Sequence, residues 1–352
     1  MKKVVLGLAT LAMVFSCQND QNDANSNDFQ EVQVDMSDFT LLVEDDGLTD
    51  KSAKGAEKCH SMNNLEYRLQ KDAGLAKKMY DVEYNTRKAI ALKANAKGKP
   101  GGGSGGGGGT TPIYTGAITI PVVINIIESS PGKVTEAQIN SQIAILNDDF
   151  NNNNSGTSSV PSEFAASVAD INITFTRGAV NRKISSNTSW GTNDAMKFAS
   201  QGGIDATDTA NNLNIWVCEI GGGILGYAQF PGGASASDGV VIGTDFFGET
   251  SAGGIYGHGR TATHEVGHWL NLRHIWGDGR CNRDDYVSDT PTSDRANYNC
   301  PSYPTTHCRS NDMTMNYMDY VQDDCMYMFT TGQNDRMRAL FVAGGAREGF
   351  VN

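Results

Sequence analysis

The sequence from residue 112 onward predicts an α/β (α+β) domain made of two lobes. A β-branched apolar run over residues 117–127 predicts a buried strand. Residues 135–150 predict a helix with its apolar side chains on one face. After a helix that ends near residue 271, residues 277–328 are rich in Asp, Pro and Cys, which is typical of loops. We therefore expect a layered N-terminal lobe, and then a loop-rich C-terminal lobe that needs more than an apolar core to stabilise it.

The remaining elements follow in chain order. Thr135 is a possible N-cap of the first helix, whose buried stripe is predicted to contain Ile139, Ile143 and Leu146. Further strands are expected over 171–177, 213–220, 226–230 and 240–244, a helix over 260–271, and a closing helix over 333–342.

Three of the chain's six histidines lie in the eleven-residue stretch 264–274, which spans the end of the helix predicted over 260–271 and the turn after it. His264 and His268 are one helical turn apart, so both imidazoles leave the same face, and Glu265 lies beside them. His274 is ten residues beyond His264, or about 15 Å along an unbroken helix, which is too far for both to bind one ion. The helix must therefore end and the chain must turn back. Asn271 tolerates the left-handed conformation that such a turn requires.

Two imidazoles on one helix face and a third ligand from the following turn are typical of a catalytic zinc site with an open coordination position. Zinc in such a site lowers the pKa of a water molecule toward neutrality and polarises a carbonyl group. Glu265 would accept the proton of that water and pass it to a leaving amine. The alternative for Glu265 is a solvated carboxylate on a helix surface.

Composition and the N-terminus indicate a protein outside the cytoplasm. The net charge is −12, and no long Lys/Arg run indicates a nucleic-acid partner. Residues 1–16 read as a signal peptide that is too short to span a membrane. Ser16-Cys17 at its end resembles a bacterial lipoprotein signal, which implies cleavage before Cys17 and a lipid anchor on its thiol. We expect an outer-membrane or cell-surface lipoprotein, or a released mature form; the alternative is an ordinary signal with an incidental cysteine.

The segment 264–274 resembles the extended zinc signature of the metzincin metalloproteases, and residues 316–320 (Asn-Tyr-Met-Asp-Tyr) resemble their Met-turn. The resemblance points in particular to the pappalysin family, in its cytophagalysin/ulilysin-like branch, and extends to stretches at 120–123, 225–231, 289–291 and 325–333. It implies an N-terminal lobe with a twisted, mostly parallel sheet, a backing helix and the zinc helix, followed by a disulfide-linked lobe with the Met-turn and a terminal helix. The implied activity is a secreted zinc endopeptidase that acts on proteins or peptides. Asn271 departs from the glycine that is usual in the family.

The same resemblance implies roles for three further residues. Met318 would lie beneath the zinc, and Tyr320 would approach the metal and stabilise the tetrahedral intermediate. Asp324 would form the base of the S1′ pocket and select Arg or Lys on the carboxyl side of the cut. The alternatives are core packing for Met318 and Tyr320 and a solvated side chain for Asp324.

Four cysteines follow the histidine cluster, and in an oxidising compartment they predict two disulfides with three possible pairings. The resemblance implies the pairs Cys281–Cys308 and Cys300–Cys325, each contributing on the order of 3 kcal/mol. Cys218, inside a predicted strand, is expected to be a buried and unreactive thiol.

The oxygen-rich stretch 284–290 resembles the family's calcium loop. The implied calcium ligands are Asp285, the Val287 carbonyl and Thr290. The alternative is an acidic loop that is simply solvated.

Cys59 lies far upstream, before residues 63–94, which predict a charged helix. Residues 101–109 are eight glycines and one serine and cannot pack into a core. The resemblance implies a cysteine switch, in which the Cys59 thiolate binds zinc and keeps the enzyme latent; the alternative is a free thiol. The expected organisation is a signal peptide (1–16), a tether and inhibitory pro-segment (17–99), a Gly-rich linker (100–111) and a catalytic domain (112–352).

Two other functions remain open on the residues alone. One is a lipid-anchored binding or adhesion protein with a structural zinc, although structural zinc normally has four protein ligands. The other is a zinc hydrolase acting on a non-peptide amide. Chelator-sensitive cleavage of peptides would separate the three.

Overall fold

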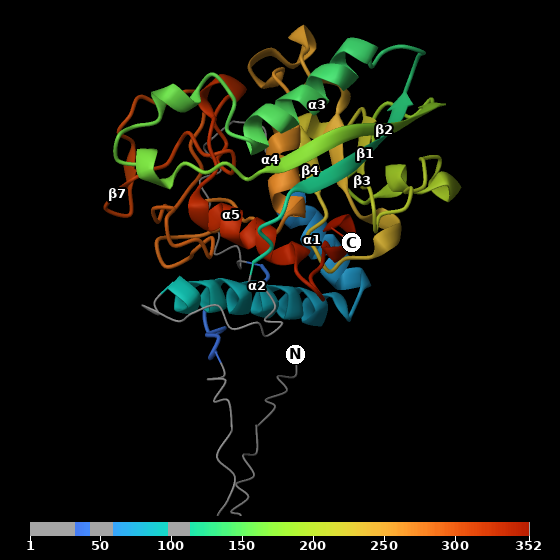
Figure 1. Cartoon of the computed structure of the whole chain (residues 1–352). Coiled ribbons are helices and arrows are strands. Elements are labelled where there is room, and N and C mark those ends of the chain that lie inside the picture. The colour runs from blue at the N-terminus through green and yellow to red at the C-terminus, as the bar shows by residue number, and fades with distance from the viewer. Residues whose placement is uncertain (1–31, 43–58, 98–112, 352) are drawn as a thin grey trace, which may run out of the picture. The chain divides into compact units, whose positions relative to one another are not determined.

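The structure is a computed structural model that describes residues 32–42, 59–97 and 113–351 (Figure 1). The expected signal peptide, Cys17 and the Gly-rich linker lie outside these residues. From residue 33 onward the described residues belong to one compact unit. None of the helices within the described ranges is long and apolar enough to cross a membrane.

The regular elements agree in order with the sequence-based expectation. The helices are α1 (Ser61–Lys71), α2 (Leu75–Lys97), α3 (Glu136–Phe150), α4 (Arg260–Trp269) and α5 (Thr331–Arg338). The strands are β1 (Ile118–Glu128), β2 (Ile173–Ile184), β3 (Leu213–Cys218), β4 (Gly226–Ala228), β5 (Val240–Gly243), β6 (Thr306–His307) and β7 (Ser310–Asn311).

The central sheet has the order β2-β1-β3-β5-β4. Strands β1, β2, β3 and β5 pair in parallel, whereas β4 is antiparallel to β5 and forms one edge. Ile124 pairs with Ile215, and Ile215 with Val240. The expected mostly parallel sheet is thus confirmed, with β2 and the single antiparallel strand β4 at its two edges.

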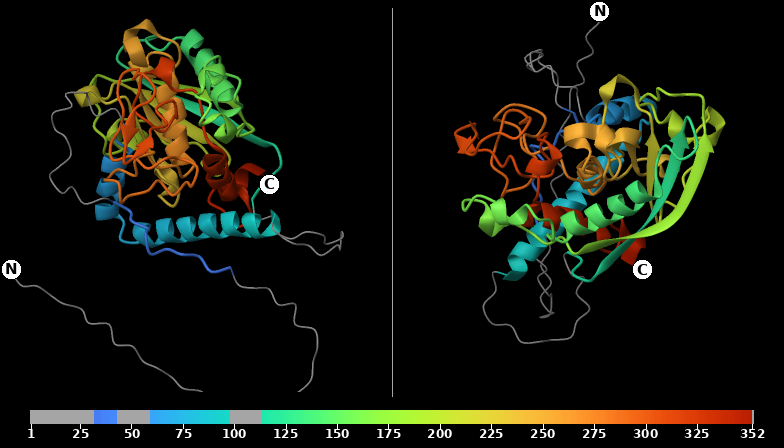
Figure 2. Two further views of the ribbon diagram at one scale, coloured as in Figure 1. Left: turned by 90° about the vertical axis from the view of Figure 1, so that its left-hand side faces the viewer. Right: turned by 90° about the horizontal axis from the view of Figure 1, so that it is seen from above.

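Helices α3 and α4 cover one face of this sheet, as the right-hand view of Figure 2 shows. Thr135 caps α3: its hydroxyl accepts a hydrogen bond from the backbone N–H of Gln138, whose side chain in turn accepts from Thr135 N–H. Ile139 and Leu146 are fully buried, while Ile143 packs at the border of the core. Burial of almost every residue of β1 explains its continuous apolar sequence, because helices or loops cover both faces.

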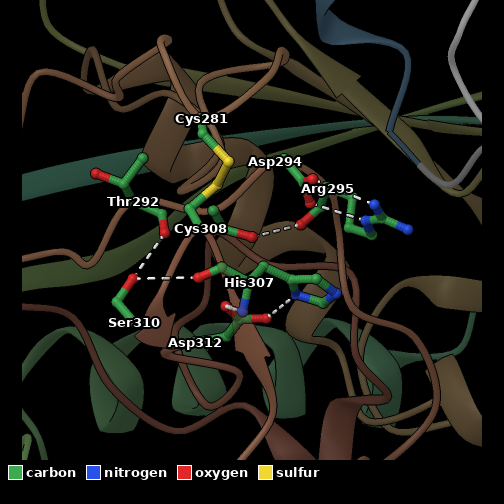
Figure 3. Close-up of a disulfide and its surroundings, with 9 residues drawn as sticks. Cys281, Thr292, Asp294, Arg295, His307, Cys308, Ser310 and Asp312 are labelled. Atoms are coloured by element: carbon green, nitrogen blue, oxygen red, sulfur yellow. Dashed lines mark hydrogen bonds and ion pairs between the residues drawn. A yellow bond between two sulfur atoms is a disulfide. The ribbon is translucent and has the colours of Figure 1, made fainter.

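The C-terminal lobe is loop-rich, and two disulfides cross-link it. Cys281–Cys308 and Cys300–Cys325 are the pairs formed, as the family resemblance implied. Figure 3 shows the first of them, beside a network in which the Ser310 hydroxyl donates to the Thr292 carbonyl. Cys218 is fully buried, and burial raises the pKa of its thiol, as expected for an unreactive cysteine.

The single helix expected over residues 63–94 is two helices, and that expectation was wrong. The chain leaves α1 at Asp72, which is extended, and the Asp72 carboxylate accepts a hydrogen bond from Gly74 N–H at 2.8 Å. An aspartate that bonds the backbone two residues ahead favours a turn over continued helix. The break lets the two helices contact different parts of the domain that follows them: α1 contacts β4 of the sheet, and α2 contacts α5.

Helix α2 lies beside α5 (Figure 1) and joins it through a buried ion pair. The Glu83 carboxylate accepts from both terminal nitrogens of Arg336, at 3.0 and 2.7 Å, and both side chains are almost fully buried. Arg87 also donates to Glu83, and on its outer side to Asp38 at 2.5 Å. We call Glu83, Arg87 and Arg336 the distal anchor.

Candidate metal centre

The three histidines come together as their spacing predicts. Nε2 of His268 lies 3.1 Å from Nε2 of His264 and 3.1 Å from Nε2 of His274. Tetrahedral zinc with Zn–N bonds of 2.0–2.1 Å would hold two nitrogens about 3.3 Å apart. The three imidazoles therefore fit one zinc ion.

Each ring is oriented by a hydrogen bond at its other nitrogen. Nδ1 of His264 lies 2.7 Å from the Tyr317 carbonyl oxygen, and Nδ1 of His268 lies 2.8 Å from that of Leu272. Nδ1 of His274 contacts the Asp278 carboxylate. A proton at each Nδ1 leaves the Nε2 lone pairs directed at the common centre. Burial, together with the two neighbouring imidazoles, lowers the pKa of His268 and favours the neutral form that a metal requires.

A left-handed residue turns the chain from α4 toward His274. Asn271 has φ 70°, as expected for the departure from glycine at this position. Helix α4 ends at Trp269, and Leu272 N–H donates to the Gly267 carbonyl at 2.9 Å. The Asn271 side chain also lies 3.5 Å from Glu83 and Thr86 of α2, a contact that glycine could not make.

Met318 packs beneath α4. It is fully buried, and a Cβ added to Gly267 would lie 2.4 Å from its sulfur atom. Gly267 therefore permits the close approach of the Met318 side chain to the helix that carries His264 and His268. Met318 thus packs in the core, against the helix that carries two of the three histidines.

Glu265 faces the pro-segment. Its Oε2 accepts from the Ser61 hydroxyl at 2.7 Å and lies 3.5 Å from the Cys59 sulfur, whereas its buried Oε1 has no hydrogen-bond partner among the described residues. Burial raises the pKa of Glu265 to about 8, although hydrogen bonds from Ser61 and Cys59 lower it. The Cys59 sulfur and one nitrogen of each of the three histidines lie within 4.8 Å of one another.

The pro-segment reaches this centre along the edge of the sheet. Cys59 forms a parallel bridge with Gly226 of β4, and His60 N–H donates to the Gly226 carbonyl at 3.0 Å. The Ser61 hydroxyl also accepts from Ala228 N–H at 2.8 Å. Tyr320 contacts both the pro-segment and the histidines. Its hydroxyl donates to the Cys59 carbonyl at 3.3 Å, and the centre of its ring is 4.9 Å from that of His274.

A cavity beside the histidines is lined by His264, Glu265, Leu225, Arg260 and Asp323, among others. Asp324, which the family resemblance placed at the base of the S1′ pocket, does not line this cavity. Its side chain is 74% exposed and points to His258, whereas Asp323 is buried. The short 3₁₀ turn at Asp323–Cys325 puts the adjacent side chains in different directions, so Asp323 and not Asp324 faces the cavity.

Asp323 is held by the start of the zinc helix. Its Oδ2 accepts from His258 N–H at 2.9 Å and Arg260 N–H at 3.3 Å. Burial raises the pKa of Asp323 to about 6, against the opposite effect of these N–H groups.

The expected calcium ligands form a compact group of oxygen atoms. The Thr290 hydroxyl lies 2.8 and 2.9 Å from the two Asp285 carboxylate oxygens and 2.7 Å from the Val287 carbonyl. Asp285 is buried, and this burial, with Asp284 nearby, raises its pKa well above the ordinary value. A buried carboxylate that meets another acid rather than a base fits a site for a cation.

The fold and site can be set beside known proteins. Residues 208–342 match the peptidase M43 family model, described as pregnancy-associated plasma protein-A. An extracellular metalloprotease of Pyricularia oryzae is 32% identical over 238 residues, which cover 64% of this chain and 76% of that protein. The chain belongs to the peptidase M43 (pappalysin) family. An extracellular metalloprotease of Neurospora crassa is 35% identical over 59% of this M43 peptidase and 68% of its own length.

Two solved structures extend the comparison. Mature mirolysin of Tannerella forsythia, in complex with a cleaved peptide, has a TM-score of 0.65 and 42% identity, covering 67% of this chain and 96% of that one. A promirolysin mutant of the same organism has a TM-score of 0.72 and 36% identity; the match covers 83% of this chain and 96% of the promirolysin chain. This M43 peptidase is therefore a metalloendopeptidase with a pro-segment, and family membership implies zinc. The alternative of a non-enzymatic binding protein is set aside.

Several functional contacts of this M43 peptidase were missed by sequence reasoning. Ser61, two residues after Cys59, bonds both Glu265 and β4, and no motif marks it. Trp276 stacks on the His274 ring at 4.4 Å. The Asp278 partner could have been found, because it follows His274 by four residues and zinc-binding histidines commonly bond a carboxylate.

Proposed function

We propose that this chain is a zinc-dependent endopeptidase made as a zymogen, in which the Cys59 thiolate occupies the open coordination position. The observation that carries the proposal is the convergence of the Cys59 sulfur on the three imidazoles, with the Glu265 carboxylate beside them. His264, His268 and His274 would hold the zinc. Zinc deprotonates a coordinating thiol outright, so the pro-segment would occupy the place of the attacking water.

In the mature form Glu265 would act as general base and then as general acid. Bound zinc supplies a Lewis acid that polarises the scissile carbonyl and acidifies water. Once Ser61 and Cys59 have left its carboxylate, Glu265 would accept a proton from water and deliver it to the leaving amine. The Tyr320 hydroxyl, which meets the Cys59 carbonyl in the zymogen, would donate to the carbonyl oxygen of the substrate as its negative charge develops.

Glu265→Gln tests this function. The variant should bind one zinc per chain and lose cleavage by about 10²–10⁴-fold, the usual contribution of a general acid–base group. Zinc content and cleavage of a peptide library, each with and without chelator, are the measurements. Full cleavage by the variant, or chelator-resistant cleavage by the parent chain, would overturn the proposal.

We propose further that the pocket at Asp323 selects Arg or Lys immediately after the cut. A buried carboxylate beside the metal centre supports this preference, because it favours a basic side chain over a neutral one. Asp323→Asn should reduce kcat/KM for peptides with Arg at that position relative to Gln, while the neighbouring Asp324→Asn serves as the exposed control. Equal effects of the two variants would remove Asp323 from the pocket role.

The finer expectations for export, anchoring and calcium are also proposals. Extracellular relatives support secretion. For a lipid anchor at Cys17, the mass of the N-terminal peptide of the protein purified from membranes gives the test. The buried Asp285 cluster supports calcium, and removal of calcium by a selective chelator should lower the melting temperature of the parent chain more than that of Asp285→Asn.

A further inference from the structure

Helix α1 inserts an arginine into the surface of the catalytic domain. The Arg68 guanidinium lies 2.7 Å from the Asp194 carboxylate and donates to the Ser237 hydroxyl at 3.0 Å. It also contacts Oε1 of Gln229, and its Nε donates to Asn64 of its own helix at 2.6 Å. Asp194, Gln229 and Ser237 all belong to the catalytic domain and are buried under this arginine.

The acceptors around Arg68 are held in place by the catalytic domain itself. Fully buried Lys197 lies 3.2 Å from the other Asp194 oxygen and donates to the Ser237 carbonyl at 2.8 Å. Nε2 of Gln229 donates to the Ala234 carbonyl at 2.9 Å, which turns its oxygen toward Arg68. The pocket therefore survives as a set of fixed oxygen acceptors when the pro-segment leaves.

Such a pocket matches a guanidinium group. Arginine carries five N–H donors in a planar fork and no acceptor, whereas lysine presents a single compact ammonium. An acidic side chain would meet the Asp194 carboxylate, and a neutral side chain without donors would leave buried acceptors unpaired.

The position of the pocket relative to the metal centre follows from β4. Leu225, just before β4, lines the cavity of Asp323, and Gln229, just after β4, lines the pocket of Arg68; Cys59 lies between them, opposite Gly226. If the residue after the cut enters the cavity at the Leu225 end, an extended substrate on this edge runs antiparallel to β4. Its residues before the cut then reach Gln229, which at about 3.3 Å per residue lies about three residues from Gly226.

We infer that the mature protease has a second specificity pocket, formed by Asp194, Gln229 and Ser237, which binds an arginine two to four residues before the scissile bond. Arg68 occupies this pocket in the zymogen. Lys197 is a positioning residue that fixes Asp194. The inference rests on the proposed function and adds a requirement on the other side of the cut, so that substrates with two separated basic residues are preferred.

Peptide kinetics with the activated enzyme test the inference without any variant. A series keeps Arg after the cut and places Arg, citrulline, Lys or Glu at each of four positions before it. We expect kcat/KM for Arg to exceed that for citrulline about tenfold at one position, with Lys intermediate and Glu lowest. Equal rates for Arg and citrulline at all four positions overturn the inference, whereas failure to cleave any peptide overturns the proposed function instead.

Two variants assign the preference to the pocket. Gln229→Met removes one acceptor and leaves the Lys197–Asp194 pair intact. Asp194→Asn combined with Lys197→Met removes both charges, so that no buried lysine is left unpaired. In each variant, the ratio of kcat/KM for Arg to kcat/KM for citrulline before the cut should fall toward one. The ratio of kcat/KM for Arg to kcat/KM for Gln after the cut should stay at its parent value. A ratio that stays at its parent value in both variants contradicts the assignment.

Discussion

Two of the regions in which the pro-segment contacts the catalytic domain differ in kind. At the metal centre Cys59 and Ser61 contact catalytic groups directly, through one sulfur and one hydroxyl. At the distal anchor Glu83 contacts Arg336, which belongs to α5 and not to the metal centre. The first region blocks the chemistry, whereas the second can only hold the segment in place. Inhibition and attachment are therefore separate properties, and each can be changed alone.

The largest expected effect comes from the blocking region. Cys59→Ala should raise the activity of the uncut chain on the order of 100-fold, equivalent to about 2.7 kcal/mol, because the thiolate no longer occupies the metal. Peptide cleavage by freshly purified, uncut protein is the measurement. Cys218→Ala, which removes another buried free cysteine, is the matched control and should stay latent. Latency of the Cys59 variant equal to that of the control would contradict the switch.

A smaller effect on activity is expected at the distal anchor, where the change should appear mainly in stability. Glu83→Gln leaves Arg336 buried without its charge partner, which typically costs about 3–5 kcal/mol. Hydrogen exchange of α2 should accelerate, while Cys59 still blocks the metal and the uncut chain gains little activity. Glu66→Gln, at an exposed site of α1, is the control. Unchanged exchange in α2 would show that the ion pair does not hold the segment.

Acid should weaken the distal anchor. Burial raises the pKa of Glu83, but Arg336 and Arg87 oppose it and lower that pKa from 4.5 to about 2. A carboxylate with a depressed pKa in the folded state stabilises that state above its unfolded pKa, and the contribution is lost as the pH falls from about 4.5 toward 2. The difference in unfolding free energy between the parent and Glu83→Gln chains, both measured with chelator, should shrink over that interval. A constant difference would contradict the assignment.

The smallest effect is expected at the outer side of the anchor. Asp38 is 55% exposed, so Asp38→Asn should change the stability by only about 0–1 kcal/mol despite its contact with Arg87. Denaturant unfolding of the full chain measures this change. A loss as large as that of Glu83→Gln would mean that burial does not separate the two ion pairs.

The sequence predicted best where the chemistry is local. The spacing of His264, His268 and His274, with Asn271 between them, required a helix and a left-handed turn, and both are present. The Thr135 cap is equally local. Contacts between distant segments were not predictable: Glu83 and Arg336 are 253 residues apart, and neither residue type indicates its partner. The sequence did not predict that Asp323 rather than Asp324 faces the cavity, because it does not give the direction of side chains in a short 3₁₀ turn.

The contact between Gly267 and Met318 bears on how the two lobes can move. Gly267 belongs to the zinc helix of the first lobe and Met318 to the Met-turn of the second, and no space remains between them for even one more carbon atom. A hinge motion that tilted the lobes together at this point would displace His264 and His268. The floor of the site is thus mechanically stiff. Departure of the pro-segment from the β4 edge would open the site to a substrate without any movement at this contact.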